Sequence, residues 1–157
     1  MAYSIQEQHS RDLDWYFIDG NKKPIHVATG GGKLPKIIEE NDEKNENLHA
    51  QILQLPIQYE IEINPILNEF VNFENEELRE LYLTDFNEMA GRGFISLDKS
   101  NLGNFEDGIY HIVAYPKGSI ISKGIELNID EFIANDLIID TQKNSSLDLL
   151  KLFENDK

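Results

Sequence analysis

The segment from Glu74 to Asp98 constrains the fold most strongly, because an amphipathic helical pattern runs into a glycine break and then an apolar strand. Apolar residues recur at helical spacing and form one arc: Leu78, Leu81, Tyr82, Phe86 and Met89. Polar residues fall on the opposite side: Glu76, Glu77, Glu80, Asn87 and Glu88. Asn72 or Asn75 suits the N-cap, and Gly91 suits the left-handed residue that follows a helix. The pattern predicts a helix over 75–90 with one buried face.

One carboxylate interrupts this apolar arc, because Asp85 lies between Leu81 and Met89. A buried carboxylate needs a charged partner, a hydrogen bond or water. Arg92, just beyond the helix, is the candidate partner. The alternative is a position at the rim of the core with access to solvent, and this is the one we expect.

Apolar and alternating segments predict a sheet of about five strands, at 14–19, 24–29, 57–63, 94–98 and 109–115. The first two strands flank a turn over 19–23 and therefore form a hairpin. Helices are expected over 46–54, 75–90 and 146–153, with an edge strand at 120–125 and a short helix over 128–134. Residues 1–12 form a loose leader or a short helical turn. We predict one α+β domain over 1–157, with a mostly antiparallel sheet and helices on one face or edge.

Charge is the dominant feature of the composition. Fourteen basic residues stand against twenty-nine acidic ones, for a net charge of −15 in 157 residues. Nucleic acids and anionic membranes bind basic surfaces, so the sequence argues against both. The acidity favours a basic protein partner or serves solubility alone. The chain has no cysteine, and its polar N-terminus and lack of a long apolar run predict a cytoplasmic protein.

Three consecutive glycines, Gly30, Gly31 and Gly32, precede Lys33 and follow a predicted strand. A phosphate-binding loop would need glycine at position 27 and serine or threonine at position 34, where this chain has Val27 and Leu34. The phosphate motif is therefore absent. The glycines allow a sharp turn at the end of the strand, or they let a ligand or partner approach the bare backbone.

Two of the four histidines, His26 and His111, lie on predicted strands and could meet across the sheet. With Asp19, Asp85 or Asp98 they could form an acid–base pair or a metal site. The alternative is a hydrogen-bonded core histidine. Metal-binding spacings and nucleophile motifs are absent from the sequence, so we expect no metal or other cofactor, and no residue is assigned a catalytic role.

Two pairs of segments resemble a group of known proteins: Trp15–Asp19 with Ile25–Pro35, and Ala90–Asp98 with Tyr110–Pro116. They resemble small uncharacterised bacterial proteins encoded beside polymorphic or secreted toxin genes, which look like immunity proteins. The resemblance covers about half of the chain. It implies a binding role and brings no catalytic residue with it.

The leading hypothesis is a non-catalytic protein-binding domain, an immunity protein that binds and masks a basic toxin. Its acidic surface would be Glu76, Glu77, Glu80 and Glu88, with the Gly30–Gly32 loop as a second candidate. The alternative is a small-molecule-binding domain or an enzyme around His26, Gly30–Gly32 and His111, and a third is a structural or regulatory subunit. The sequence does not predict an oligomeric state.

Overall fold

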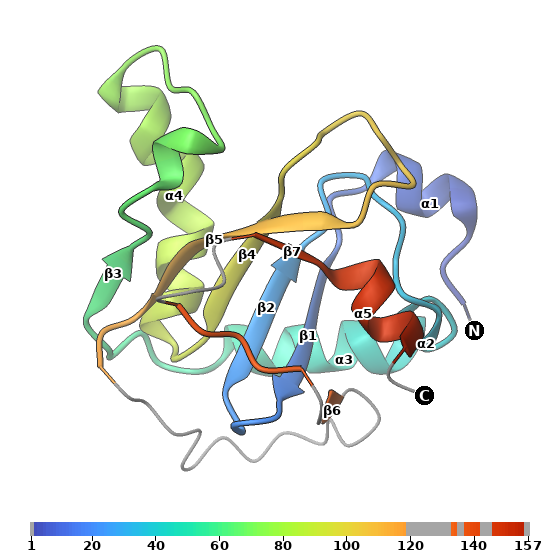
Figure 1. Ribbon diagram of the computed structural model, residues 1–157. Coiled ribbons are helices and arrows are strands. Elements are labelled where there is room, and N and C mark those ends of the chain that lie inside the picture. Colours follow the sequence, from blue (N-terminus) through green and yellow to red (C-terminus); the bar gives the residue numbers. More distant parts are fainter. Residues whose placement is uncertain (1, 119–132, 135–136, 142–145, 156–157) are drawn as a thin grey trace.

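The computed structural model describes residues 2–118, 133–134, 137–141 and 146–155 (Figure 1). Its helices are α1 Ile5–Ser10, α2 Lys36–Glu39, α3 Asp42–Leu53, the 3-10 turn η1 Leu67–Glu69, α4 Glu76–Gly91 and α5 Leu149–Asn155. Its strands are β1 Asp14–Asp19, β2 Pro24–Ala28, β3 Ile61–Ile63, β4 Ile95–Lys99, β5 Ile109–Pro116, β6 Ile133–Ala134 and β7 Ser146–Asp148. The chain is a single α+β domain, as predicted. The predicted edge strand at 120–125 lies outside the described residues.

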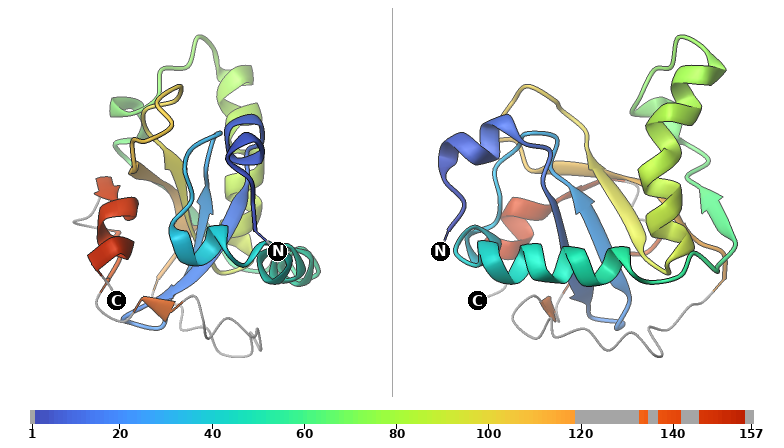
Figure 2. Two further views of the ribbon diagram at one scale, coloured as in Figure 1. Left: turned by 90° about the vertical axis from the view of Figure 1, so that its right-hand side faces the viewer. Right: turned by 180° about the vertical axis from the view of Figure 1, so that it is seen from behind.

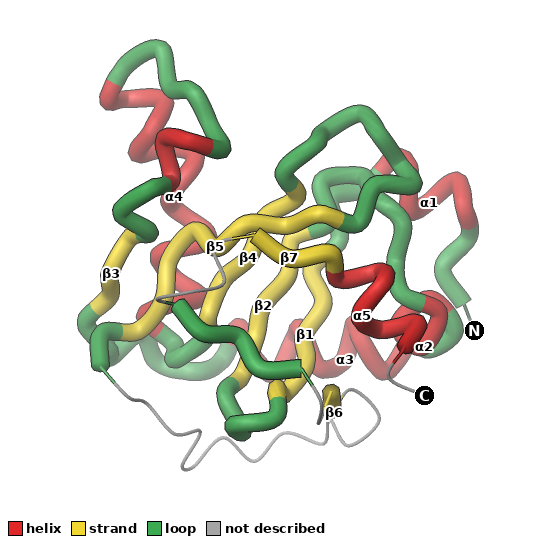
Figure 3. Tube along the Cα trace, in the orientation of Figure 1, coloured by secondary structure: helices red, strands yellow, loops and turns green. Residues whose placement is uncertain are grey.

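The strands form one mixed sheet in the order β3-β5-β4-β2-β1-β6, and β7 pairs with β5 beside this path (Figure 3). Antiparallel pairs predominate, as predicted, but β2–β4 and β1–β6 are parallel. The β1–β2 hairpin turns at Asp19, whose carboxylate accepts the Asn21 and Lys23 amides at 2.9 Å. The strand β4 pairs with β2 after the intervening chain has formed α2, α3, β3 and α4. The start of β1 and the ends of β2 and β4 therefore meet at one end of the sheet.

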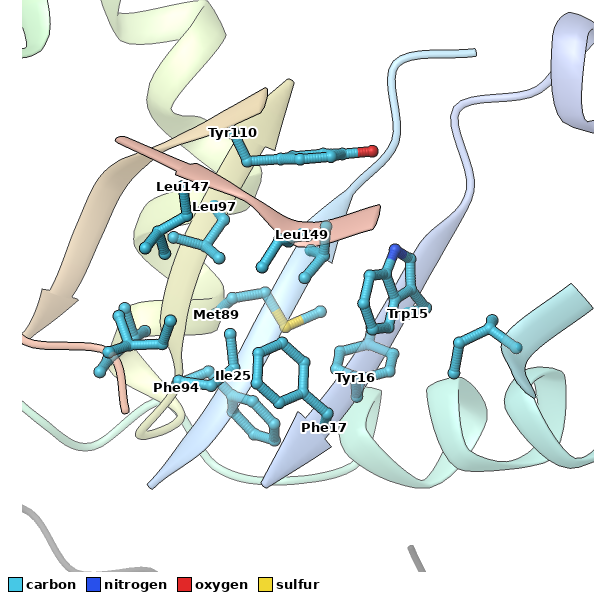
Figure 4. Packing of buried hydrophobic residues seen from close by; sticks show 14 of the residues in the cluster. Trp15, Tyr16, Phe17, Ile25, Met89, Phe94, Leu97, Tyr110, Leu147 and Leu149 are labelled. Carbon is cyan, nitrogen blue, oxygen red and sulfur yellow. The ribbon is translucent and has the colours of Figure 1, made fainter. Parts of the chain in front are cut away.

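Helices cover both faces of the sheet. The helices α3 and α4 pack on one face, and α5 lies on the other (Figure 2). Apolar side chains fill the space on both faces, and Figure 4 shows the cluster around β1, β2, β4 and β7. Along β1, Trp15 and Phe17 pack against Phe153 of α5, while Tyr16 packs against Phe94 and His49. The strand β1 is therefore buried on both faces.

The helix α4 spans Glu76–Gly91, close to the predicted 75–90, and only part of the predicted apolar arc is buried, including Phe86 and Met89. Asn75 caps it by accepting the Leu78 amide at 2.8 Å. Leu83, Phe86 and Ala90 face the sheet, whereas Leu78 and Leu81 are exposed, because the first turns of α4 project beyond the sheet (Figure 1). The prediction that Leu78 and Leu81 belong to the buried arc was wrong.

Two backbone hydrogen bonds close the end of α4. The Gly93 amide donates to the Ala90 carbonyl, and the Phe94 amide donates to the Met89 carbonyl. The left-handed residue is Gly93, with φ +107°, and not Gly91 as predicted. Gly91 is the last helical residue and is buried. A Cβ atom there would lie 2.5 Å from Cγ2 of Ile57, so glycine serves close packing at this position.

Three further predictions need correction. Only Ile61–Ile63 of the predicted strand at 57–63 pairs with β5, because the amides of Gln58 and Tyr59 bond instead to the Gly91 carbonyl. The predicted helix over 146–153 begins as strand β7, which pairs with β5, and becomes helical at Leu149. In the predicted helix over 128–134, residues 133–134 form strand β6, and the rest lies outside the described residues.

The N-terminal segment is ordered against the domain. Of the two alternatives, a loose leader or a short helical turn, the structure has the helix α1. Tyr3 and Gln8 are buried, and Gln8 bonds to Glu39 and to the Leu34 amide. Among the described residues, no helix is both long enough and apolar enough to cross a membrane.

Candidate functional site

An open cleft lies at the end of the sheet where β1 starts and β2 and β4 finish, and residues of α1 and α4 contribute to its lining. Its volume is about 630 Å³, which falls in the range of roughly 300–1,000 Å³ for small-molecule sites. Four carboxylates line it: Asp12, Asp14, Asp85 and Asp98. His26, Tyr82, Phe86 and Leu102 contribute further to the walls, and Arg11 stands at the edge. We call this feature the acidic cleft.

His26 forms part of the floor and is held from both sides. Its Nε2 lies 2.7 Å from Oδ1 of Asp14, and its Nδ1 lies 2.5 Å from Oγ of Ser96. A neutral imidazole satisfies both contacts by donating from Nε2 to Asp14 and accepting the Ser96 hydroxyl at Nδ1. The Ser96 side chain is fully buried, so it is not accessible as a nucleophile. These contacts fix the positions of the His26 and Asp14 side chains. The Ser96 hydroxyl is not available for covalent catalysis.

A second set of hydrogen-bonded side chains leads from the cleft wall to His111. The Tyr82 hydroxyl donates to Oδ2 of Asp98 at 2.7 Å and lies 3.2 Å from Nε2 of His111. Ser100 contacts Nδ1 of His111 at 2.9 Å, and Phe70 stacks on the imidazole. Burial lowers the pKa of His111 to about 4, so the ring is neutral at pH 7. Tyr82 and Asp98 separate His111 from the cleft.

The two histidines therefore do not form a common site. His26 on β2 faces Ser96 of β4, while His111 on β5 faces Asp98, two residues further along β4. Of these two histidines, His26 lines the cleft and His111 does not. Among the described residues, no group of three or more histidine, aspartate or glutamate side chains has the geometry to hold a metal ion.

Among the described residues, His26 is the basic side chain that contacts a carboxylate of the cleft, with its Nε2 2.7 Å from Oδ1 of Asp14. Burial raises the pKa of Asp12, and the charges of Asp14 and Asp85 add to the effect, while the Gly30 amide opposes it. Burial likewise raises the pKa of Asp98 to about 6, with the Tyr82 hydroxyl opposing and Asp12 adding. In the described part of the chain, no lysine or arginine forms an ion pair with any of the four. The cleft therefore carries a negative field that favours a cation.

Arg11 stands at the edge of the cleft without neutralising it. Its guanidinium pairs with Glu7 at 3.4 Å and with Glu46 at 3.3 Å, on the α1 and α3 side. Both ion pairs are solvent-exposed, and they engage the guanidinium with glutamates outside the cleft.

The triple-glycine loop forms one wall of the cleft through Gly30 and Gly31. Both residues have positive φ, and the Gly30 amide donates to Oδ1 of Asp12 at 2.8 Å. A Cβ atom on Gly30 would lie 2.7 Å from Leu102, and one on Gly32 would lie 3.0 Å from Nζ of the buried Lys99. The glycines thus allow the β4–β5 loop to pack closely on this wall.

The other sequence-predicted residues lie in different places. Glu76, Glu77, Glu80 and Glu88 are exposed on α4, outside the cleft. Asp85 is exposed and lines the cleft, whereas Arg92 donates from Nε to the Leu55 carbonyl at 3.2 Å. Asp19 lies in the β1–β2 turn and accepts backbone amides, so it takes no part in the cleft.

Sequence reasoning missed Asp12, Asp14 and Tyr82 as site residues. The Asp12-Leu13-Asp14 alternation, directly before a buried strand, is the signal that could have found the first two. Tyr82 was assigned to the apolar arc, because periodicity does not show that a hydroxyl reaches a carboxylate across the interior.

Comparison with models of protein families, with curated proteins and with solved structures finds no match to this chain.

Proposed function

We propose that this chain is a non-catalytic protein-binding domain, a bacterial immunity protein that binds and masks a basic toxin in the cytoplasm. The observation that carries the proposal is the open cleft with four carboxylates and no lysine or arginine paired to them among the described residues. A partner that inserts a lysine or arginine would supply the missing charge. Masking needs only affinity and steric cover, so it requires no catalytic group.

The surface of α4 extends the same field. Glu76, Glu77, Glu80 and Glu88 are exposed on this helix, whose side chains Tyr82, Asp85 and Phe86 line the cleft. A toxin that acts on nucleic acid has a basic groove, which carboxylates can occupy in place of phosphates. Complementary charge of this kind speeds association and is weakened by salt.

The test is affinity capture from the native bacterium, followed by expression of the captured protein with and without this chain. We expect the partner to arrest growth alone and to be neutralised when this chain is present. Asp85→Lys should weaken the protection, whereas Glu60→Lys, an equal charge change at an exposed position outside the cleft, should not. A captured partner that is harmless, or whose toxicity this chain leaves unchanged, would contradict the immunity function.

A second candidate is a small-molecule-binding domain around His26 and Gly30–Gly32, with His111 behind the wall. The volume of the cleft and the presence of His26 in its floor favour this alternative. The ligand would be a small organic amine, because the lining is acidic. Calorimetric titration with spermidine tests it: stoichiometric binding that Asp85→Lys abolishes would support this function, and absence of heat would count against it.

A further inference from the structure

Two leucines beside the acidic cleft are unusually exposed. Leu81 on α4 is 72% exposed and Leu102 on the β4–β5 loop is 68% exposed, the highest values for large apolar side chains among the described residues. Leu81 lies one helical turn before Asp85 on the same side of α4, and Asp85 lines the cleft. Leu102 itself lines the cleft.

We propose that Leu81, Leu102 and the carboxylates between them form a docking surface for a basic segment of a partner protein. In this arrangement one lysine or arginine of the partner enters the cleft, and apolar side chains beside it cover the two leucines. The inference rests on the proposed protein-binding function and adds the location of the interface and the chemistry of the segment that it takes.

Charge complementarity selects this occupant. An apolar segment alone would cover the leucines but would bury the carboxylates of Asp12 and Asp85 without a counterion, which is unfavourable. A second copy of this chain would bring the same carboxylates face to face, in a protein with net charge −15. A segment with both a cation and apolar neighbours satisfies both parts of the surface.

In an interface a few side chains, packed near its centre and surrounded by a polar rim, anchor the partner and carry most of the binding energy. Removing such an anchor typically weakens binding by about tenfold or more. Both leucines are exposed in the free protein, so their replacement by alanine leaves the core intact. Loss of binding in these variants then reports the interface and not unfolding.

The experiment is selection from a random twelve-residue peptide library displayed on phage, with counter-selection against the Leu81→Ala, Leu102→Ala double variant. The enriched peptides are synthesised with a fluorophore, and Kd is measured by fluorescence polarisation at low and high salt. Leu53→Ala is the matched control, because Leu53 is 44% exposed on α3 and lies outside the cleft.

We expect enriched peptides to carry lysine or arginine next to leucine, isoleucine or phenylalanine. Each single leucine variant should raise Kd by about tenfold or more. Asp85→Asn should also raise Kd and reduce its salt dependence, while Leu53→Ala should bind as the parent does.

Four results would overturn the docking surface. The first is that no peptide is enriched over the counter-selection, and the second is that the enriched peptides lack basic residues. The third is that the leucine variants bind the peptides with unchanged affinity. The fourth is that light scattering shows a dimer of this chain that Leu81→Ala dissociates.

The growth assay distinguishes failure of this inference from failure of the immunity function. Protection that survives the double leucine variant rejects the docking surface alone, whereas leucine-dependent peptide binding without protection rejects only the immunity function.

Discussion

Replacement of Asp98 by asparagine should stabilise the fold at neutral pH. Asp98 is 9% exposed, and burial raises the pKa of its carboxyl from 3.8 to about 6. Well below pH 3.8 the group is protonated in both the folded and the unfolded chain. As the pH rises through about 6, the folded protein must ionise a buried carboxyl, and stability is lost. The asparagine variant does not undergo this loss.

The magnitude follows from the two pKa values. One pKa unit corresponds to about 1.4 kcal/mol, so the shift from 3.8 to about 6 corresponds to about 3 kcal/mol. Asparagine has nearly the same shape and keeps an oxygen that can accept the Tyr82 hydroxyl. We expect the free energy of unfolding of Asp98→Asn to be close to that of the parent near pH 4 and to exceed it by up to about 3 kcal/mol at pH 7.

His111 acts in the opposite direction. Burial lowers its pKa from 6.5 to about 4, so its contribution to stability is present above pH 6.5 and is lost as the pH falls toward 4. In the parent, the contributions of Asp98 and His111 therefore oppose each other between these values. In Asp98→Asn only that of His111 remains, so stability should rise with pH more steeply than in the parent.

Urea unfolding from pH 4 to pH 8, followed by the fluorescence of the buried single tryptophan Trp15, measures these differences. Asp85→Asn is the control, because it removes an exposed carboxylate from the same cleft. Its stability should differ from the parent by less than about 1 kcal/mol at every pH. The reasoning is refuted if Asp98→Asn is less stable than the parent at pH 7, or if the difference between them does not change with pH.

Three further predictions concern the polar contacts, the glycine wall and the acidic helix. Tyr82→Phe removes the hydroxyl that donates to Asp98 and should lower the free energy of unfolding by about 1–3 kcal/mol in urea melts. Gly31→Ala should destabilise more than Gly103→Ala in the same assay. Both positions have positive φ, but only the Cβ of residue 31 would meet backbone, the carbonyl oxygen of His9 at 3.0 Å. Reversal of charge at Glu76, Glu80 and Glu88 should slow association with an identified basic partner without unfolding the chain. Stopped-flow rates that are flat with salt and equal to the parent would show that this face does not bind.

Local patterns predicted most of the secondary structure. The β1–β2 hairpin, β4 and β5 follow from apolar segments bounded by turn residues, and α4 follows from helical periodicity and a cap. The helix α3 was predicted over 46–54, but it begins at Asp42, in the charged segment before the apolar pattern. Each of these signals lies within a short stretch of chain, so it can be read without knowing the neighbours.

Other elements depend on contacts that local patterns do not contain. Ser146–Asp148 reads as the start of a helix, yet it is a strand because Leu147 pairs with Tyr110 of β5. Leu78 and Leu81 fit an amphipathic arc, yet they are exposed, because α4 extends past the sheet that would have covered them. Periodicity shows which residues share a face, whereas the length of the opposing surface decides which of them are buried.

The residues of the acidic cleft were likewise only partly predictable from the sequence. The sequence alone determined that the chain is strongly acidic. It also made His26, Asp85, Asp98 and the Gly30–Gly32 loop candidate site residues. Only the tertiary structure decided that Asp12 and Asp14 line the same cleft and that Tyr82 separates His111 from it. The physical reason is the parallel pairing of β2 with β4, which sets the end of β4 at the same end of the sheet as the start of β1, with the end of β2 between them. Side chains of α4 line the cleft at this end. Strand order is a property of the whole core, and no single segment of the chain encodes it.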